Sequence, residues 1–314
     1  MLGDLSRAKG TLSTVARKGA AVHAVLLYGP EGVGKGVLAR ELAQAWMCPE
    51  SGEDGVACGE CRICKAVEAD KAVDLQSVTP WGPSWIIKLG ALREQPDDND
   101  PPPNIPLLEF FRTGPMMAKR KVAVLHEVHR MNPSTSNAFL KALEEPAPYV
   151  RIVMTTSAFS QVLPTIRSRC MCVACDLPDE KSIALALGGL SSIESVFGDS
   201  PGSVMHIREH SVHFEELLAL LDGCRSAPFG KALLLAEGCR AIAERYAADA
   251  GLSNRNANAE IVQAVGRWAV NRIPEHHRFL GAVAESHRLI RGNALAALVY
   301  ETLFLRLMNE IAEL

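Results

Sequence analysis

No apolar run in this sequence of 314 residues approaches the roughly 20 residues that a helix needs to span a bilayer. The segment from Met1 to Ala20 mixes charged residues with Gly and Ser, and it lacks the apolar stretch of a secretory signal. These two absences argue against the membrane and secreted classes. We expect a cytoplasmic protein that has no membrane partner.

A large excess of basic charge is missing as well. The chain carries 33 Lys and Arg against 36 Asp and Glu, which gives a net charge of -3. A protein that coats nucleic acid needs a basic surface, so this balance argues against a free-standing zinc-containing nucleic-acid protein and allows only local contacts. The triplet from Lys119 to Lys121 is one such place, where DNA contact and a solvated strand entrance both stay open.

What is present is the composition of a soluble globular chain, with 48% hydrophobic and 22% charged residues. The length is about twice that of a usual domain, so we expect two or three domains. Nine cysteines, of which four lie between Cys48 and Cys64, favour metal binding in a reducing compartment over a disulfide framework.

Apolar runs alternate with helical patterns in the first half of the chain, as they do in a parallel sheet wrapped by helices. The expected strands are Val22–Tyr28, Val122–His126 and Arg151–Thr156, and the expected helices are Gly34–Met47 and Ser134–Leu143. This order predicts an α/β nucleotide domain.

The second half differs, because strand-like runs disappear after Asp176 and helical patterns continue to Leu314. We expect it to be all-helical, and the apolar spacing makes Ala294–Ile311 its clearest helix. Before this change of character, the acidic, proline-rich stretch Gln95–Pro106 forbids a regular element and is predicted to be a surface loop.

The segment Gly29-Pro-Glu-Gly32-Val-Gly34-Lys35-Gly36 follows an apolar strand and precedes a helix, which is the setting of a phosphate-binding P-loop. The glycines and Lys35 are suited to hold the phosphates of ATP, but Gly36 stands where Ser or Thr normally coordinates Mg²⁺. One metal ligand is therefore missing, and binding of ATP without turnover stays open.

The strand that would supply the second acidic site ends in His126-Glu127, where a magnesium-binding Asp and a catalytic Glu are expected. Glu127 has the position of a water-activating base, but such a base needs a well-held metal to act. We expect negligible ATP hydrolysis by this chain. A working ATPase that tolerates unusual ligands is the alternative. A two-histidine metal site at His126 and His129 is disfavoured, because a strand end and the following turn do not set ligand geometry.

Cys48, Cys58, Cys61 and Cys64 are spaced C-x9-C-x2-C-x2-C, which brings four thiolates into a short loop. Four thiolates suit a closed, structural Zn²⁺ site. An iron–sulfur cluster uses similar ligands, but nothing else in the sequence indicates redox work. The remaining cysteines are expected to be core side chains. Three of them lie on a strand-like stretch, Cys170, Cys172 and Cys175, and two lie in helical patterns, Cys224 and Cys239.

Several segments, taken together and in order, resemble the AAA+ subunits of bacterial clamp loaders. They are His23-Ala24, the P-loop, the four cysteines, Asn137-Ala-Phe-Leu-Lys-Ala-Leu-Glu-Glu-Pro146 and Leu163-Pro-Thr-Ile-Arg-Ser-Arg-Cys170. The resemblance implies an α/β AAA+ P-loop domain with a parallel sheet and an inserted zinc module at residues 48–64. This domain would span residues 1–176, followed by a small helical lid at 177–212 and an all-α collar for oligomerisation at 213–314. The Asp/Pro-rich stretch has no counterpart in the family pattern.

Within that family, the motif Ser168-Arg169-Cys170 places Arg169 at a subunit boundary as an arginine finger for a neighbour's ATP. A guanidinium on the γ-phosphate neutralises charge that develops in the transition state. A surface salt bridge is the alternative role for Arg169. In the lid segment Gly198–Ser203, the arginine that follows a Gly-Ser pair in hydrolysing members is missing, and Arg208 comes several residues later.

A degraded site of its own and an intact finger are the pattern of a delta-prime-like member, while an active gamma/tau-like motor is the alternative. The length agrees, because the sequence has no further C-terminal extension of the tau kind. The resemblance implies a heteropentamer with gamma/tau and delta subunits in a DNA polymerase III complex. Its further partners would be the beta sliding clamp and, mainly through the complex, primed DNA.

Overall fold

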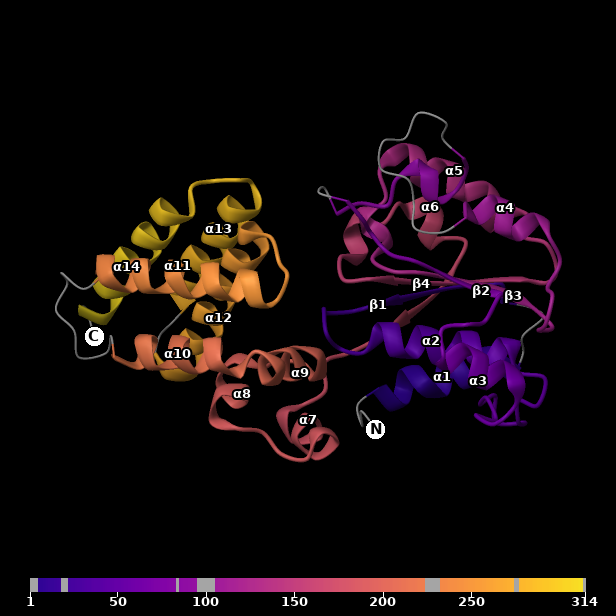
Figure 1. Ribbon diagram of the computed structural model, residues 1–314, viewed down its shortest axis with the longest axis horizontal. Coiled ribbons are helices and arrows are strands. Elements are labelled where there is room, and N and C mark those ends of the chain that lie inside the picture. Colours follow the sequence, from indigo (N-terminus) through magenta and orange to yellow (C-terminus); the bar gives the residue numbers. More distant parts are fainter. Residues whose placement is uncertain are drawn as a thin grey trace. The chain divides into compact units, whose positions relative to one another are not determined.

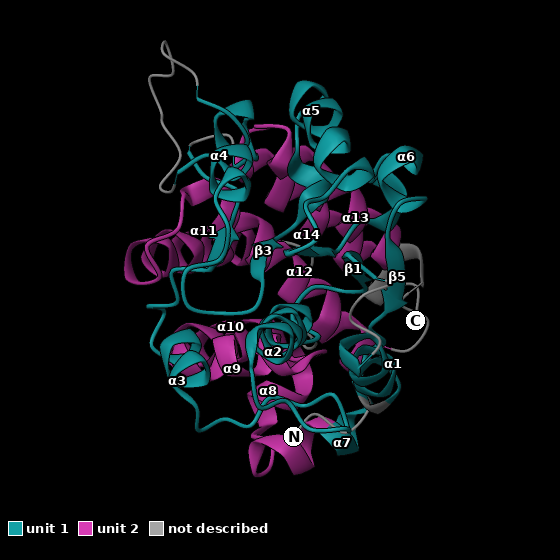
Figure 2. Ribbon diagram, turned by 90° about the vertical axis from the view of Figure 1, so that its right-hand side faces the viewer, with its two compact units in different colours: residues 1–182 teal, residues 183–314 magenta. Residues whose placement is uncertain are grey.

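The computed structural model describes residues 5–17, 22–82, 85–94, 105–223, 232–273 and 277–312. The chain forms two compact units, residues 1–182 and 183–314 (Figure 1, Figure 2). The predicted collar and nearly all of the predicted lid belong to the second unit, and the boundary between lid and collar stays a prediction. In the described part of the chain, no helix is both long and apolar enough to cross a membrane.

The first unit is built on a sheet of five parallel strands in the order β2-β3-β4-β1-β5. The strands are β1 (Ala24–Tyr28), β2 (Leu75–Val78), β3 (Lys121–Leu125), β4 (Val150–Thr156) and β5 (Met171–Ala174). The predicted parallel α/β architecture is confirmed, and the three expected strands correspond to β1, β3 and β4. β2 has no counterpart among the elements expected from the sequence.

Alternate side chains of β1 enter two different cores, as the two-residue period of a strand requires. Ala24 and Leu26 pack on one face of the sheet, and Val25 and Leu27 pack on the other. Helices cover both faces, as Figure 1 shows. The first face carries α4 (Leu107–Arg112), α5 (Pro133–Glu144) and α6 (Pro164–Arg167), and the second carries α1 (Ser6–Arg17), α2 (Lys35–Met47) and α3 (Arg62–Glu68).

Local chemistry explains where the helices next to the sheet begin. α5 starts with a proline at its first turn, and the Asn132 side chain accepts a hydrogen bond from the Thr135 amide at 2.8 Å. α2 starts after Gly34, whose φ of 107° lies in the left-handed region that favours glycine. At Gly29, a Cβ atom would lie only 2.0 Å from the carbonyl oxygen of Cys175. The loop between β1 and α2 therefore needs glycine at both of these positions.

In its described residues the second unit forms helices joined by short connections, with no strand, as the sequence predicts. Its helices are α7 (Glu180–Leu187, which begins just before the unit boundary), α8 (Ser192–Phe197), α9 (Pro201–Glu209), α10 (Ser211–Asp222), α11 (Ala232–Asp249), α12 (Asn254–Arg272), α13 (His277–Arg291) and α14 (Ala296–Ala312). One hydrophobic cluster runs from Ile193 in α8 to Met308 in α14. The helix predicted at Ala294–Ile311 is α14.

Two expectations about single side chains are wrong. Lys121 is only 4% exposed, and its ammonium donates to the Phe110 carbonyl oxygen at 2.8 Å and to the Thr113 hydroxyl. It therefore does not face solvent, although the strand-entrance interpretation requires it to do so. Cys172 is exposed although a core position was expected, because β5 is an edge strand that pairs only with β1.

The other remaining cysteines divide as follows. Cys175 and Cys239 are buried, as expected, and Cys170 is half-buried. Cys224 lies outside the described residues. Residues 95–104, which make up most of the stretch predicted to be a surface loop, also lie outside them.

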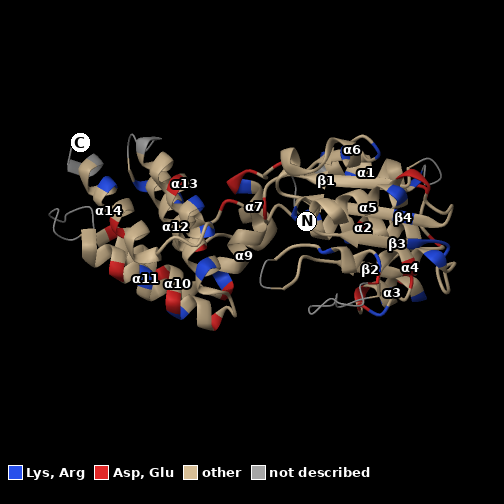
Figure 3. Ribbon diagram, turned by 90° about the horizontal axis from the view of Figure 1, so that it is seen from above, with Lys and Arg blue, Asp and Glu red and all other residues tan. Residues whose placement is uncertain are grey.

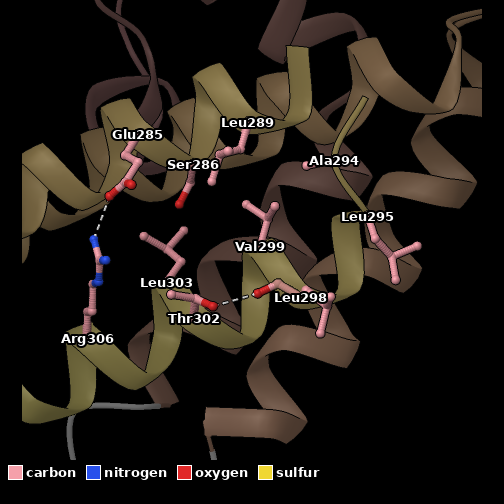
Figure 4. Close-up of a pocket in the computed structure, with 10 residues that line it drawn as sticks. All are labelled: Glu285, Ser286, Leu289, Ala294, Leu295, Leu298, Val299, Thr302, Leu303 and Arg306. Atoms are coloured by element: carbon pink, nitrogen blue, oxygen red, sulfur yellow. Dashed lines mark hydrogen bonds and ion pairs between the residues drawn. The ribbon is translucent and has the colours of Figure 1, made fainter. Parts of the chain in front are cut away.

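In the second unit, α13 and α14 line a cavity of about 210 Å³ (Figure 4). Most of its lining is apolar, with Leu298 projecting at the rim and 59% exposed. An ion pair of 2.8 Å between Arg306 and Glu285 crosses one end of it. This pocket belongs to the helical core, not to the P-loop.

Candidate functional site

The structure brings the P-loop lysine and the predicted catalytic carboxylate into one site. Lys35 begins α2 and is 5% exposed, and its ammonium donates to the carbonyl oxygens of Gly29 at 2.8 Å and Pro30 at 2.6 Å. The same ammonium lies 3.9 Å from Oε1 of Glu127, which follows β3. Burial lowers the pKa of Lys35, and the charge of Glu127 opposes this shift.

Both carboxylate oxygens of Glu127 are engaged by this chain's own groups. Oε1 faces Lys35, while Oε2 accepts hydrogen bonds from the Ser157 amide at 2.9 Å and from the Ser157 hydroxyl at 2.6 Å. Nδ1 of His129 lies 3.3 Å from Oε2 and 3.1 Å from the Thr156 hydroxyl. The Glu127 backbone has a φ of 51°, which is strained for a residue with a side chain. The carboxylate is therefore held in a fixed network at the end of β4.

The two positions that depart from the magnesium-binding pattern face each other. A Cβ atom at Gly36 would lie 3.7 Å from Cε1 and 3.9 Å from Nδ1 of His126. The imidazole thus borders the place into which a Ser or Thr hydroxyl at position 36 would project. Burial lowers the pKa of His126, against the opposing charge of Glu127, so the ring is neutral at neutral pH. A glycine and a neutral imidazole are poor partners for Mg²⁺, which takes oxygen ligands.

Arg169 lies just beyond α6 and forms an ion pair within the chain. Its Nη2 is 2.6 Å from Oε1 of Glu144, at the end of α5, and its Nη1 donates to the Thr165 carbonyl oxygen at 2.9 Å. The side chain of Arg169 is still 35% exposed. The neighbouring Ser168 hydroxyl donates to the same Thr165 carbonyl oxygen at 3.1 Å. The guanidinium is thus partly exposed and is paired with groups of its own chain.

Arg167 has a different environment from Arg169, although only one residue separates them. Its guanidinium lies 4.9 Å from the centre of the Phe159 ring, which itself stacks on Tyr28 at 4.2 Å. Tyr28 is the last residue of β1, so Arg167 packs against the P-loop side of its own domain. The two arginines lie close together in the sequence motif, but the structure gives them different partners.

The segment in which the sequence lacks the lid arginine leads into the start of α9. Ser200 and Ser203 make a reciprocal capping box there, which leaves Ser203 occupied with the helix end. Arg208 is bound within the second unit: its Nε lies 2.8 Å from Oε1 of Glu194, and its Nη1 and Nη2 donate to carbonyl oxygens of α7 and the following turn. Arg208 therefore has a structural partner of its own.

The four predicted metal ligands converge in the first unit, where Cys48 and Cys64 are buried and Cys58 and Cys61 are half-buried. The Sγ–Sγ distances are 3.6 Å from Cys48 to Cys58, 3.9 Å from Cys48 to Cys61 and 3.9 Å from Cys58 to Cys64. A tetrahedral zinc ion with Zn–S bonds of about 2.3 Å requires sulfur atoms about 3.8 Å apart. These three distances are close to that spacing, and all four sulfur atoms lie within 4.8 Å of one another, so the cluster can hold one tetrahedral metal ion.

Backbone amides support this cluster. The amides of Cys61 and Cys64 each point at a cluster sulfur at 3.4 Å, on Cys58 and Cys61 respectively. The Cys61 amide is the main reason why the pKa of Cys58 is lowered. Cys61 also caps the first turn of α3, so the helix and the cluster order one another. Amides that stabilise thiolate charge are what a thiolate metal site needs.

Basic groups in the second unit are largely matched by acidic ones. Figure 3 shows acidic residues on α10 and both basic and acidic residues on α11. Two of the ion pairs there join Arg240 to Glu244 and Arg245 to Glu216. These ion pairs place a carboxylate beside each of the two arginines of α11.

Some residues of the site were missed at the sequence level. Ser157 binds Glu127 and Glu144 binds Arg169, but both pairings depend on strand and helix ends that lie far apart in the sequence. A different signal was readable and overlooked: His206, Glu209 and His210 form a His-x-x-Glu-His pattern within α9 and its C-cap. Their ligand atoms lie within 4.8 Å of one another.

Comparison with known proteins places this geometry in context. A family model described as "DNA polymerase III, delta subunit" matches residues 5–178. The delta-prime subunit of DNA polymerase III from Pseudomonas aeruginosa is 32% identical over 201 residues, which cover 64% of this chain and 53% of that protein. The tau/gamma subunit from Haemophilus influenzae is 30% identical over 200 residues, which cover 64% of this chain and 27% of that protein.

The chain therefore spans about half or less of the length of these curated relatives. Among solved structures, a gamma subunit-related protein of DNA polymerase III from Thermotoga maritima has a TM-score of 0.58 at 18% identity. That match covers 96% of this chain and 99% of the other chain, and at this identity it supports the fold alone.

Proposed function

The chain belongs to the DNA polymerase III delta-subunit family, and from this premise we propose that it is a clamp-loader subunit of the delta-prime type. In this proposal it does not hydrolyse ATP itself. It presents Arg169 to an ATP bound by a neighbouring subunit, and Ser168 helps to position that arginine. The runner-up is an active ATPase subunit of the gamma/tau type.

The observation that carries the proposal is the contrast between the chain's own nucleotide site, which departs from the catalytic pattern, and Arg169, which keeps it. The chain's own site has Gly36 and His126 at the magnesium positions, and Lys35 and Glu127 bind each other. Catalysis of phosphoryl transfer depends on a metal held between the phosphates, which these residues cannot hold well. Arg169, in contrast, keeps a surface position from which it can reach another molecule.

The proposed partners follow from the same role. An arginine that acts in trans requires an ATP-binding neighbour, for which gamma/tau subunits are the candidates, and a delta subunit would complete the heteropentamer. The complex would load the beta clamp on primed DNA at the expense of ATP bound by the partners. This chain would contact DNA mainly as part of the complex.

We also propose that Cys48, Cys58, Cys61 and Cys64 bind one structural Zn²⁺. All four ligand positions are supplied by the protein, so no position is left open for a substrate. ATP binding at the glycines of the P-loop, Gly29, Gly32 and Gly34, is not required by the proposal.

The test is ATP turnover by a reconstituted clamp loader in the presence of clamp and primed DNA, with substitutions in this subunit alone. Arg169→Ala is expected to lower turnover at the dependent site by about 10³-fold or more, the range found for arginine fingers. Lys35→Ala is expected to leave turnover within about twofold. Arg240→Ala, which removes a surface arginine of the second unit, is the matched control.

Two results would reject the proposal. The first is a large loss with Lys35→Ala together with a small loss with Arg169→Ala, which would assign turnover to this chain's own site. The second is ATP hydrolysis by the isolated wild-type chain that disappears in Lys35→Ala. Either outcome supports the motor alternative.

A further inference from the structure

A cluster of histidines lies in the second unit, within residues that the proposed clamp-loader role does not use. His206 is in the last turn of α9, and His210 is the residue that caps the helix. Glu209 lies between them, so the sequence reads His-x-x-Glu-His. Residues four apart share one face of a helix, and histidines in this relation can hold one metal ion together.

The side chains have the geometry of a ligand set. The ring centres of His206 and His210 are 4.8 Å apart, and one ligand atom from each of His206, Glu209 and His210 lies within 4.8 Å of the others. Ligand atoms on a tetrahedral zinc ion are about 3.3 Å apart when the bonds are about 2.0 Å long. Small side-chain rotations close this difference. The side chain of His206 is 39% exposed, so an ion can reach it from solvent.

A second, independent feature points to a metal ligand. Nε2 of His206 is hydrogen-bonded to the Tyr246 hydroxyl and lies 3.3 Å from Oε2 of Glu260, in α12, and the Tyr246 hydroxyl donates to that same carboxylate oxygen. Metal-binding histidines commonly donate one ring N–H to a carboxylate, which fixes the tautomer and orients the ring. With the proton on Nε2, the lone pair of Nδ1 is left for a metal ion.

The packing around the pair also restricts how the rings move. The Tyr246 ring lies 5.9 Å from that of His206 and 5.4 Å from that of His210, in edge-on arrangements. Tyr246 itself is fully buried in the helical core. Pre-oriented ligands lose less conformational entropy when an ion binds.

We propose that His206, Glu209 and His210 form a second metal site, which takes a divalent transition-metal ion and matches Zn²⁺ best. Two imidazoles and one carboxylate are a ligand set that suits zinc, with water in the fourth position. Glu260 is the positioning residue that orients His206. The site joins the end of α9 to α10, and the proposal is one of binding, without a catalytic step.

The experiment uses the full chain whose cysteine cluster has first been filled with one equivalent of Zn²⁺. Calorimetric titration with further Zn²⁺, at mildly alkaline pH, is expected to show a second equivalent bound. His210→Asn is expected to weaken this binding at least tenfold. His287→Asn, at a histidine of α13 that bonds Gln263, makes the same chemical change elsewhere and should leave the second site intact.

To test whether Glu260 orients His206, the experiment must measure a property that a general loss of packing would not change. Glu260→Gln is expected to weaken the second site about 10- to 100-fold, the range seen when a carboxylate behind a metal-bound histidine is changed. The ¹⁵N chemical shifts of His206 should at the same time report loss of the Nε2-protonated tautomer. An unchanged tautomer and affinity would overturn the positioning role.

The site itself is overturned if the wild-type chain binds no second equivalent of Zn²⁺. It is also overturned if His210→Asn binds that equivalent as tightly as wild type, or if His287→Asn loses it to the same extent. These outcomes are independent of ATP turnover by the assembled complex, so they leave the proposed role of Arg169 untouched.

Discussion

Replacing Glu144 with Gln removes the carboxylate that holds the guanidinium of Arg169 at 2.6 Å. The two side chains are 45% and 35% exposed, so water screens their attraction. Exposed ion pairs of this kind contribute about 0.2–1 kcal/mol to stability. Moving Arg169 from Glu144 to a neighbour's phosphate therefore costs no more than about 1 kcal/mol from this pair, which corresponds to a factor of about five.

We expect Glu144→Gln to raise ATP turnover of the reconstituted clamp loader, by at most about fivefold, because the free arginine is more available. The change is measured as turnover per complex at a subsaturating concentration of this subunit. Glu145→Gln removes the same charge from the adjacent, exposed residue and is the matched control. In the background of Arg169→Ala, Glu144→Gln should have no effect, since no finger remains to be released.

A loss of turnover greater than tenfold in Glu144→Gln would refute this reasoning. It would mean that Glu144 holds Arg169 in its active position instead of competing for it. An equal gain in Glu145→Gln would refute it in another way, because the effect would then come from surface charge in general.

Two further predictions concern stability. Cys58→Ser should abolish the uptake of one zinc equivalent, measured by elemental analysis. It should also lower the melting temperature by about 4–8 °C, which corresponds to a decrease of about 2 kcal/mol in the free energy of unfolding. Cys172→Ser, at an exposed cysteine, is the control and should change neither quantity. Glu194→Gln should destabilise the chain by about 1–2 kcal/mol at neutral pH, since the carboxylate binds Arg208 and caps α8. Because the Arg208 hydrogen bond lowers the pKa of Glu194 in the folded state, the stability it contributes is present at neutral pH and is lost as the pH falls through that lowered pKa. Urea unfolding curves of wild type and variant should therefore converge in acid, and a difference that grows in acid would contradict the assignment.

The P-loop domain was readable from the sequence because its signals are local. An apolar strand, a glycine-rich turn and an amphipathic helix follow one another directly, and β1 and α2 form where this pattern places them. The cysteine cluster was readable for the same reason, since its four ligands lie within 17 residues, between the end of α2 and the first turn of α3. β2 was missed because it is four residues long and contains Gln and Ser.

Other features depend on contacts that no local pattern carries. Lys121 begins an apolar strand, where a charge usually faces water, but here the ammonium folds back onto the carbonyl oxygen of Phe110. Gly36 and His126 each depart from the magnesium-binding pattern in the sequence, but only the fold shows that they lie next to each other. Glu144 ends α5, and Arg169 follows β4, a loop and α6, so their ion pair depends on how α5 and α6 pack.

The shared core of the second unit has a mechanical consequence. Arg267 and Asn271 in α12 donate to the carbonyl oxygens of Phe197 at 2.8 Å and Val196 at 3.1 Å, which ties the end of α8 to the long helices. Helices of the predicted lid and collar thus belong to one packed body, which begins at Ile183. Because α8 and α14 share this hydrophobic core, a displacement of α8 would have to be accommodated by the packing of the described helices as far as α14.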